Sequence, residues 1–183
     1  MKREGLERWV DGLRGGDPAA LDAVFTALRP RLFSYLCRLG ARREVAEDLV
    51  QEAFLRLAEK APTLRPDTRV DAWMFAVGRN LLVSWWRRHG RGIEVLTDVV
   101  IDHPDSLSPF EHALASETER RLERAVASLP PGLRDPLLLV AVEGFEPQEA
   151  AAICGLRPDA LRQRLHRARE ILARALSRGK EAT

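Results

Sequence analysis

Long side chains that carry hydrogen-bond donors gather on one predicted helix near the end of the chain. At helical spacing they share one face, and an apolar row that begins with Leu161 and Leu165 occupies the opposite face. Arginine and glutamine donate in pairs to base edges, and the major groove of DNA admits an α-helix. The pattern therefore predicts a helix that reads duplex DNA, although the basic, solvated face of an ordinary helical hairpin also fits the periodicity. The four donors are Arg162, Gln163, His166 and Arg167.

The residues before this helix predict the turn that positions it. Pro147 marks the start of a short helix and Gly155 marks its end. The small side chains of Ala150 and Ala151 allow another helix to pack closely. Pro158 then starts the next helix after a very short connection. Two helices joined this tightly form a helix-turn-helix, whose second helix enters the major groove.

A second group of residues suited to nucleic acid lies in the first half of the chain. Two adjacent tryptophans, Trp85 and Trp86, are followed directly by Arg87 and Arg88. Bases of single-stranded or melting DNA can stack on aromatic rings while arginines hold the phosphates. A single tryptophan is more often part of a core, so burial of the rings is the alternative. Adjacent arginines are hard to bury, and they favour an exposed helix end that faces phosphate.

The formal net charge of +2 conceals an uneven distribution of charge. Residues 79–91 contain four arginines and no acid, and residues 157–180 contain eight basic residues against two acids. Between them, residues 92–123 contain eight acids against two arginines. Each basic stretch can attract phosphate, although a run of charge is usually just a solvated helix face.

Helical periodicity dominates the 183 residues, and strand signals are poor. Val45, Leu49 and Ala53 recur at helical spacing, and Asp17 before Pro18 is a plausible helix N-cap. We expect an all-α fold of two helical domains joined by a flexible acidic linker. The domains are expected at 17–90 and 112–178 and the linker at 91–111. The predicted helices cover 18–28, 31–39, 44–60, 71–88, 110–129, 134–142, 147–154 and 158–176, with a proline-bearing loop at 61–70.

The composition and the motifs of the chain argue against several classes of protein and site. The two cysteines, Cys37 and Cys154, lie far apart without neighbouring ligand motifs, so neither a disulfide framework nor a metal site is expected. The charged residues 1–16 lack the apolar core of a signal peptide, and the longest apolar run, 137–142, is too short to span a membrane. We find no nucleophile–base pair and no phosphate-cradling glycine loop. These absences predict a soluble, cytoplasmic binding protein without a cofactor, not an enzyme.

Four stretches of the chain resemble a known family. The run A-E-D-L-V-Q-E-A-F-L-R-L at 46–57 resembles region 2.2 of extracytoplasmic-function (ECF) sigma factors of the sigma-70 family. The run A-W-M-F-A-V-G-R-N-L at 72–81 resembles the family's T-W-L-Y-R-I-A-R-N-L. In the second half, L-P-P at 129–131 with L-L-L at 137–139 resembles the start of region 4, and R-Q-R-L-H-R-A-R at 162–169 is similar to its K-S-R-L-H-R-A-R. The resemblance covers about 20–90 and 120–176.

The resemblance implies a sigma factor that binds core RNA polymerase and directs promoter-specific initiation. It implies contacts with the β′ clamp helices and the β flap of the polymerase, promoter DNA as the second partner, and an anti-sigma factor as the third. The acidic linker would run through the polymerase channel and mimic nucleic-acid charge. Core-binding residues would be Asp48, Gln51, Glu52 and Arg56. Contacts to the −35 element would come from Arg162, Gln163, His166 and Arg167. Contacts to the −10 element would come from Arg65, Asp67, Arg69, Asn80, Ser84, Arg87 and Arg88. Within this second group, the loop 65–69 would capture a flipped base.

The sequence departs from the family pattern at several positions. Ala76 replaces a usual arginine, and Ser84 stands where aspartate is frequent. Asp159 replaces a glycine at the start of the DNA-reading helix, where an acid favours the helix dipole but repels phosphate. Gln163 replaces a small serine, so the −35 sequence is expected to differ from the familiar one. Arg157 stands where proline or serine is usual and is a poor N-cap.

Three other functions remain open at the level of sequence. An ordinary helix-turn-helix regulator would dimerise and bind symmetric duplex sites. A sigma-like decoy would bind the polymerase without starting transcription. A helical enzyme is the weakest alternative, because no catalytic site is visible.

Overall fold

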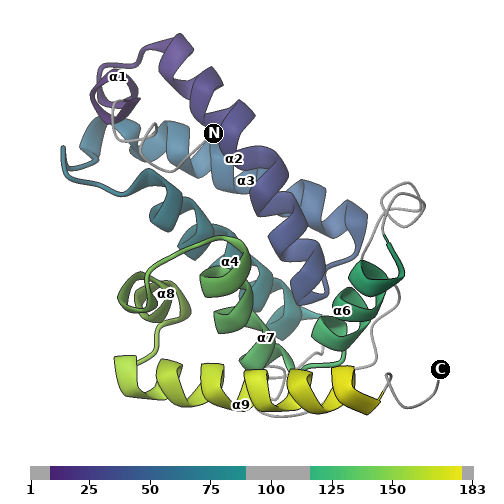
Figure 1. Cartoon of the computed structure of the whole chain (residues 1–183). Coiled ribbons are helices and arrows are strands. Elements are labelled where there is room, and N and C mark those ends of the chain that lie inside the picture. The colour runs from purple at the N-terminus through teal and green to yellow at the C-terminus, as the bar shows by residue number, and fades with distance from the viewer. Residues whose placement is uncertain (1–8, 90–115, 179–183) are drawn as a thin grey trace.

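The computed structural model describes residues 9–89 and 116–178, and every regular element in these ranges is helical. The N-terminal domain contains α1 (Val10–Arg14), α2 (Pro18–Leu39), α3 (Arg43–Lys60), the short 3₁₀ turn η3 (Ala61–Thr63) and α4 (Val70–Arg88). The C-terminal domain contains α6 (Glu117–Ala127), α7 (Pro131–Leu137), the π-helical turn η5 (Leu138–Val142), α8 (Pro147–Cys154) and α9 (Pro158–Arg178). The expected linker at 91–111 lies outside the described residues. Figure 1 shows the two groups of helices side by side, with α9 along one edge.

Helix α2 begins and ends as its sequence predicts. The Asp17 side chain accepts a hydrogen bond from the Ala19 amide at 2.9 Å, and Gly40 ends the helix with a φ of +108°. The prediction of two helical segments, 18–28 and 31–39, is wrong, because one helix runs through Pro30. Proline removes one backbone hydrogen bond, but the buried side chains of Leu28 and Leu32 hold the helix against the core on both sides of it.

The remaining N-terminal helices complete a compact bundle around α2. Helices α3 and α4 confirm the predicted helices at 44–60 and 71–88, and the loop between them contains the 3₁₀ turn η3 and a second turn closed by the Thr68 amide and the Arg65 carbonyl. A Cβ atom on Gly78 of α4 would lie 2.8 Å from a Leu32 methyl carbon, so glycine permits the close approach of α4 to α2. Helix α1 was not predicted, yet Val10 and Leu13 bury its apolar side in the core.

The C-terminal domain differs from its predicted boundaries at two places. Helix α6 starts after Ser116, whose hydroxyl and Glu119 form a reciprocal capping box, and the expected start near Phe110 lies outside the described residues. The helix predicted at 134–142 starts earlier, at Pro131, and ends in the π-helical turn. Proline suits a first helical position because its missing amide proton has no helical partner there. Helix α9 spans 21 residues and is not a short helix.

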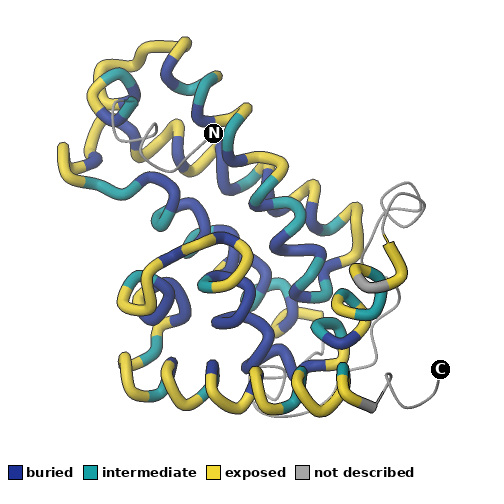
Figure 2. Tube along the Cα trace, in the orientation of Figure 1, coloured by how far each residue is buried: buried dark blue, intermediate teal, exposed yellow. Residues whose placement is uncertain are grey.

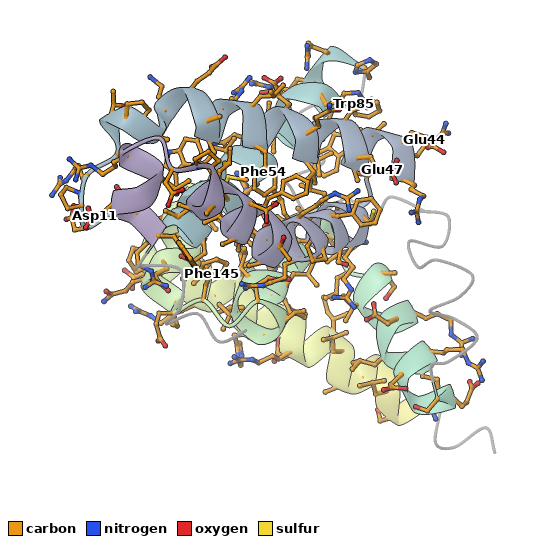
Figure 3. The ribbon with its side chains drawn as sticks, turned by 90° about the horizontal axis from the view of Figure 1, so that it is seen from above. Asp11, Glu44, Glu47, Phe54, Trp85 and Phe145 are labelled. Carbon is orange, nitrogen blue, oxygen red and sulfur yellow. The ribbon has the colours of Figure 1, made fainter. Side chains whose placement is uncertain are left out.

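Buried apolar side chains from both domains form one continuous cluster. The Phe75 ring of α4 lies 5.1 Å from the Tyr35 ring of α2 and 5.1 Å from the Phe145 ring, which precedes α8. Figure 2 shows that the darkest, buried stretches face one another where α4, α7 and α8 meet. Figure 3 places Phe145 at this junction of the two domains. The described chain is therefore a docked pair of helical domains.

Candidate nucleic-acid interface

The turn between α8 and α9 has the geometry that its sequence predicts. Gly155 adopts a φ of +65°, and the Leu156 amide donates to the Ala151 carbonyl at 2.8 Å, which closes the end of α8. Helix α9 begins at Pro158. Leu161 and Leu165 are buried on its inner side. The four predicted −35 contacts, Arg162, Gln163, His166 and Arg167, are all exposed on the outer side.

Two of these four donors already pair with acids of the same helix. The Arg162 guanidinium donates to the Asp159 carboxylate one turn earlier. The His166 Nε2 atom lies 3.5 Å from a Glu170 carboxylate oxygen. Exposed pairs of this kind contribute little free energy, so a base edge or a phosphate can displace the acids. The outer face of α9 is thus a row of exposed hydrogen-bond donors.

Other arginines of the same region turn inward and hold α9 in place. Arg164 donates to the Gly132 carbonyl of α7 at 3.2 Å, and Arg121 of α6 donates to the Leu176 carbonyl at 3.0 Å. The sequence analysis left Arg164 out of the exposed donor face but did not predict its inward contact with α7. Its position three residues after Leu161 was the available signal, because it places Arg164 at the edge of the apolar row.

The end of α4 presents most of the predicted −10 contacts together. Asn80, Arg87 and Arg88 are exposed and Ser84 is half-buried. Arg87 donates to the Ser84 hydroxyl at 3.2 Å, and Arg88 donates to the Ser84 carbonyl at 3.3 Å. Ser84 therefore organises the two arginines at the C-terminal end of the helix, where cations also interact favourably with the helix dipole.

One of the two adjacent tryptophans is a core residue and the other is partly exposed. Trp86 is buried in the core, whereas Trp85 is half-buried and stacks on the His89 ring at a centroid distance of 4.2 Å. Figure 3 shows Trp85 on the outer side of its helix. One of the two rings is thus a core residue, and the other can offer a flat surface to a base.

The structure does not bring all the predicted loop residues together. Arg65 and Asp67 are exposed and form a two-pronged ion pair with both distances at 3.0 Å. Arg69 instead turns toward the C-terminal domain, where it donates to the Glu149 carboxylate of α8 at 2.6 Å and to Asp71 at 3.3 Å. In this conformation Arg69 is engaged by an acid of the other domain.

The predicted core-binding residues lie on the outer side of α3. Asp48, Gln51 and Arg56 are exposed, and Arg56 donates to the half-buried Glu52 at 2.8 Å. Asp48 and Gln51 line a groove of about 540 Å³ between α2 and α3, and Phe54, which Figure 3 labels there, forms part of its wall. The sequence analysis missed the exposed apolar rim of this groove, Phe25 and Leu55, because residue type alone does not tell an exposed apolar side chain from a buried one.

A buried polar cluster between the domains also escaped the sequence analysis. Tyr35 of α2 and Arg79 of α4 both bind the Asp135 carboxylate of α7, each at 2.6 Å. The thiol of Cys154 lies beside this cluster, and burial raises its pKa well above the ordinary value. A neutral, buried thiol is a poor nucleophile and a poor metal ligand.

Across 9–89 and 116–178, His, Cys, Asp and Glu side chains form no group of three or more that could hold a metal ion. In the part of the chain that the structure describes, no helix combines the length and the apolar character of a membrane span.

Comparison with family models and curated relatives gives a consistent result. Residues 24–92 match the model of sigma-70 region 2, and residues 119–172 match that of sigma-70 region 4. The ECF RNA polymerase sigma factor EcfG of Rhodopseudomonas palustris is 31% identical over 85% of this chain and 83% of its own length. The ECF RNA polymerase sigma factor SigF of Caulobacter vibrioides is 37% identical over 91% of this chain and 92% of its own length.

Solved structures resemble both domains. The sigma factor RpoE of Bartonella quintana, in complex with the anti-sigma factor NepR, superimposes with a TM-score of 0.65 at 26% identity and covers 85% of this chain and 96% of that one. CnrH, in complex with the cytosolic domain of CnrY, has a TM-score of 0.69 at 21% identity and covers 93% of this chain and 96% of that one, which supports the fold.

Proposed function

The chain belongs to the ECF sigma factors of the sigma-70 family, and we propose which of its surfaces perform each task of a sigma factor. A sigma factor binds core RNA polymerase and directs initiation to promoters through their −10 and −35 elements. It is not an enzyme, since the polymerase carries out the chemistry. The assignment of residues to tasks rests on exposure, charge and position in the fold.

The outer face of α9 is the proposed −35 reader. One observation supports this assignment. Directly after a tight turn, α9 buries Leu161 and Leu165 on one face and exposes a row of hydrogen-bond donors on the opposite face. Arg162 and Gln163 in the first two turns are placed to reach base edges, and His166 and Arg167 follow one turn later. Arg164 acts as a positioning residue through its bond to α7.

The C-terminal half of α4 and the loop before it form the proposed −10 reader. Asn80, Arg87 and Arg88 supply exposed donors, and Ser84 orients the two arginines. Trp85 offers its partly exposed ring to an unstacked base. Arg65, Asp67 and Arg69 of the loop would capture a flipped base, which offsets roughly a few kcal/mol of unstacking. Arg69 must leave Glu149 to take part.

Helix α3 is the proposed docking surface for the polymerase. Asp48, Gln51 and Arg56 present polar groups beside the apolar rim of the groove, so a helical partner can bury apolar area while pairing with the charges. The partner would be the β′ clamp helices, and the C-terminal domain would meet the β flap. We place this activity in the cytoplasm, where polymerase and promoter DNA are found.

An anti-sigma factor is the third proposed partner. The RpoE structure that resembles this chain at 26% identity is a complex with the anti-sigma factor NepR. The groove between α2 and α3 exposes Phe25 and Leu55 beside Asp48, so a partner bound there would compete with the polymerase.

Run-off transcription with purified bacterial core polymerase and a pool of random promoters tests the function. We expect transcripts that depend on this protein and share two spaced upstream motifs. Binding to core polymerase without specific start sites would instead identify a decoy. Binding of duplex DNA alone, as a dimer on symmetric sites, would identify an ordinary helix-turn-helix regulator.

A further inference from the structure

The first turn of α9 carries an acid that binds a side chain and not the helix end. At the starts of other helices, polar side chains accept hydrogen bonds from backbone amides: Asp17 does so before α2, and capping boxes close the starts of α6 and α8. In the bonds that the structure gives Asp159, its carboxylate accepts from the Arg162 guanidinium alone. Asp159 is therefore directed at the exposed donor row of α9.

Asp159 belongs to a row of side chains along the outer face of this helix. Residues three and four positions apart are neighbours on a helix surface, so Asp159, Arg162, His166 and Glu170 form one row. Arg162 pairs with Asp159, and His166 Nε2 lies 3.5 Å from a Glu170 oxygen. All four side chains are more than half exposed. The two donors of the row are thus flanked by negative charge on the face proposed to read DNA.

Helix stability does not account for an acid at this position. Pro158 already occupies the first helical position, and Gly155 ends α8 with its left-handed conformation. A pair as exposed as Asp159–Arg162 contributes little to the free energy of unfolding. Recognition is the property that this pair is placed to change.

The contact with Asp159 leaves Arg162 able to bind guanine. A guanidinium has five N–H donors in one plane, and Asp159 accepts from Nη2. Guanine presents two acceptors in the major groove, O6 and N7, and takes two parallel N–H groups of an arginine. The carboxylate also restricts a long exposed side chain, so Arg162 loses less conformational entropy when a base binds. Arg162 can therefore hold Asp159 and a guanine together.

A phosphate group lacks this compatibility with Asp159. The edge of guanine is uncharged, whereas a phosphate brings a second negative charge beside the carboxylate. Two unit charges roughly 6 Å apart in water repel enough to change a binding constant about threefold. The Asp159–Arg162 pair consequently favours a base edge over the DNA backbone.

We propose that Asp159 is a positioning residue that sets specificity at one base pair of the −35 element. It orients Arg162 toward a guanine and disfavours contact with phosphate, so it lowers affinity for duplex DNA in general and raises discrimination. The inference rests on the proposed function of α9 and names the base that Arg162 reads. Because the family that the chain resembles has glycine at this position, the effect is a property of this chain.

Transcription by core polymerase with the full chain, on templates that randomise each −35 position, tests the proposal. Wild-type protein should prefer guanine at the one position where Arg162→Ala removes the preference. Asp159→Ala should lower that preference about three- to tenfold, while affinity for a duplex without a promoter rises about threefold. In the Arg162→Ala background, Asp159→Ala should change no base preference further, because it acts only through Arg162.

Two further variants separate the charge of Asp159 from its positioning role. Asp159→Asn keeps an acceptor for Arg162 without the charge, so it should retain more of the guanine preference than Asp159→Ala and show the same gain in non-specific affinity. Glu170→Gln is the matched control, since it removes one acid from the other end of the same row. It should leave the preference at the Arg162 position unchanged. A role in helix stability alone would weaken transcription from all templates equally.

The outcomes distinguish this inference from the function on which it rests. A loss of guanine preference that requires Arg162 supports the inference. An unchanged preference in Asp159→Ala, an equal loss on all templates, or a preferred base other than guanine overturns it. If wild-type protein starts no transcripts, the proposed function fails, and selection of random duplexes by the full chain then makes the same comparison between variants. A wild type that selects no base in either assay overturns both.

Discussion

Two arginine–aspartate pairs of this protein have the same chemistry and opposite surroundings. Arg79 and Asp135 meet in the interior between the domains, with side chains 9% and 4% exposed, whereas Arg162 and Asp159 meet on the outside of α9, with side chains 69% and 77% exposed. Water screens the outer pair, so the pair contributes little free energy and a base edge or a phosphate could displace its acid. The inner pair is stronger because little water reaches it to screen the charges, and the Tyr35 hydroxyl also donates a hydrogen bond to Asp135. Burial, and not residue type, thus separates a contact that fixes conformation from one that lies on the proposed DNA-reading face.

Breaking the inner pair should have the largest effect. Asp135→Ala leaves the Arg79 charge buried without its partner, so the free energy of unfolding should fall by about 3–5 kcal/mol. Urea denaturation followed by circular dichroism measures it. Asp159→Ala is the matched control, because it removes the outer acid and should change stability by about 0.5 kcal/mol or less. Equal losses in the two variants would contradict the comparison.

Removing the outer arginine should affect promoter choice and not stability. Arg162→Ala should weaken −35 recognition by about 1–3 kcal/mol, or roughly five- to 150-fold, at one or two base positions. Transcription from templates that vary each −35 position measures it. Arg174→Ala, on the same helix about three turns farther on and also exposed, should leave base preference unchanged. An unaltered base preference in Arg162→Ala would remove α9 from the proposed −35 contact.

Alkaline pH should destabilise the inner cluster. Burial raises the pKa of Cys154 above its ordinary value of 9.0 and that of Tyr35 above 10.0. Below the ordinary pKa of such a group, the folded and the unfolded chain are both protonated there, and the group does not lower the stability. As the pH rises above that value, the group ionises in the unfolded chain only, so the free energy of unfolding falls. Each group should contribute a loss of about 1.4 kcal/mol per pH unit above its ordinary value. Between pH 9 and 10 the slope should be shallower in Cys154→Ala.

Arg134 should act in the opposite sense at higher pH. Its pKa is lowered to about 10, so the unfolded chain binds more protons above that pH and this group alone favours folding as the pH rises. The test of Cys154 therefore belongs below pH 10. A slope that is identical in wild type and Cys154→Ala would contradict the burial of the thiol as the cause.

Neutralising the outer acid should have the smallest effect. Asp159→Asn removes a negative charge near the proposed DNA contact and frees Arg162, so affinity for duplex DNA should rise a few-fold, or by about 0.5–1 kcal/mol. Fluorescence anisotropy at two salt concentrations measures it, and the gain should shrink at the higher concentration. A loss of affinity would show that Asp159 itself contacts the promoter.

Local signals made much of the fold predictable. Asp17, Pro18 and Gly40 mark the ends of α2, and Gly155 with Pro158 marks the turn that orients α9. These signals act within a few residues, so they are visible in sequence. Exposure of the four donors on α9 followed from helical periodicity alone.

Contacts between distant residues were beyond the reach of sequence. Tyr35 and Asp135 are 100 positions apart, and Arg79 and Asp135 are 56 apart, so no spacing rule connects them. Pro30 gave a local signal for a break that tertiary packing overrides. Helix α1 is only five residues long and depends on burying Val10 and Leu13, which propensity cannot foresee.

The distance between the domains in the free and the promoter-bound protein tests the account most directly. Donor and acceptor dyes attached at Lys60→Cys and Arg174→Cys lie outside the proposed contacts, and the native cysteines are buried and should resist labelling. We predict high energy transfer in the free protein, where the domains are docked, and a sharp loss of transfer in the complex with core polymerase and promoter, because elements centred near −10 and −35 are about 25 base pairs, or roughly 85 Å, apart. Unchanged transfer in a complex that starts transcripts would contradict separation of the domains.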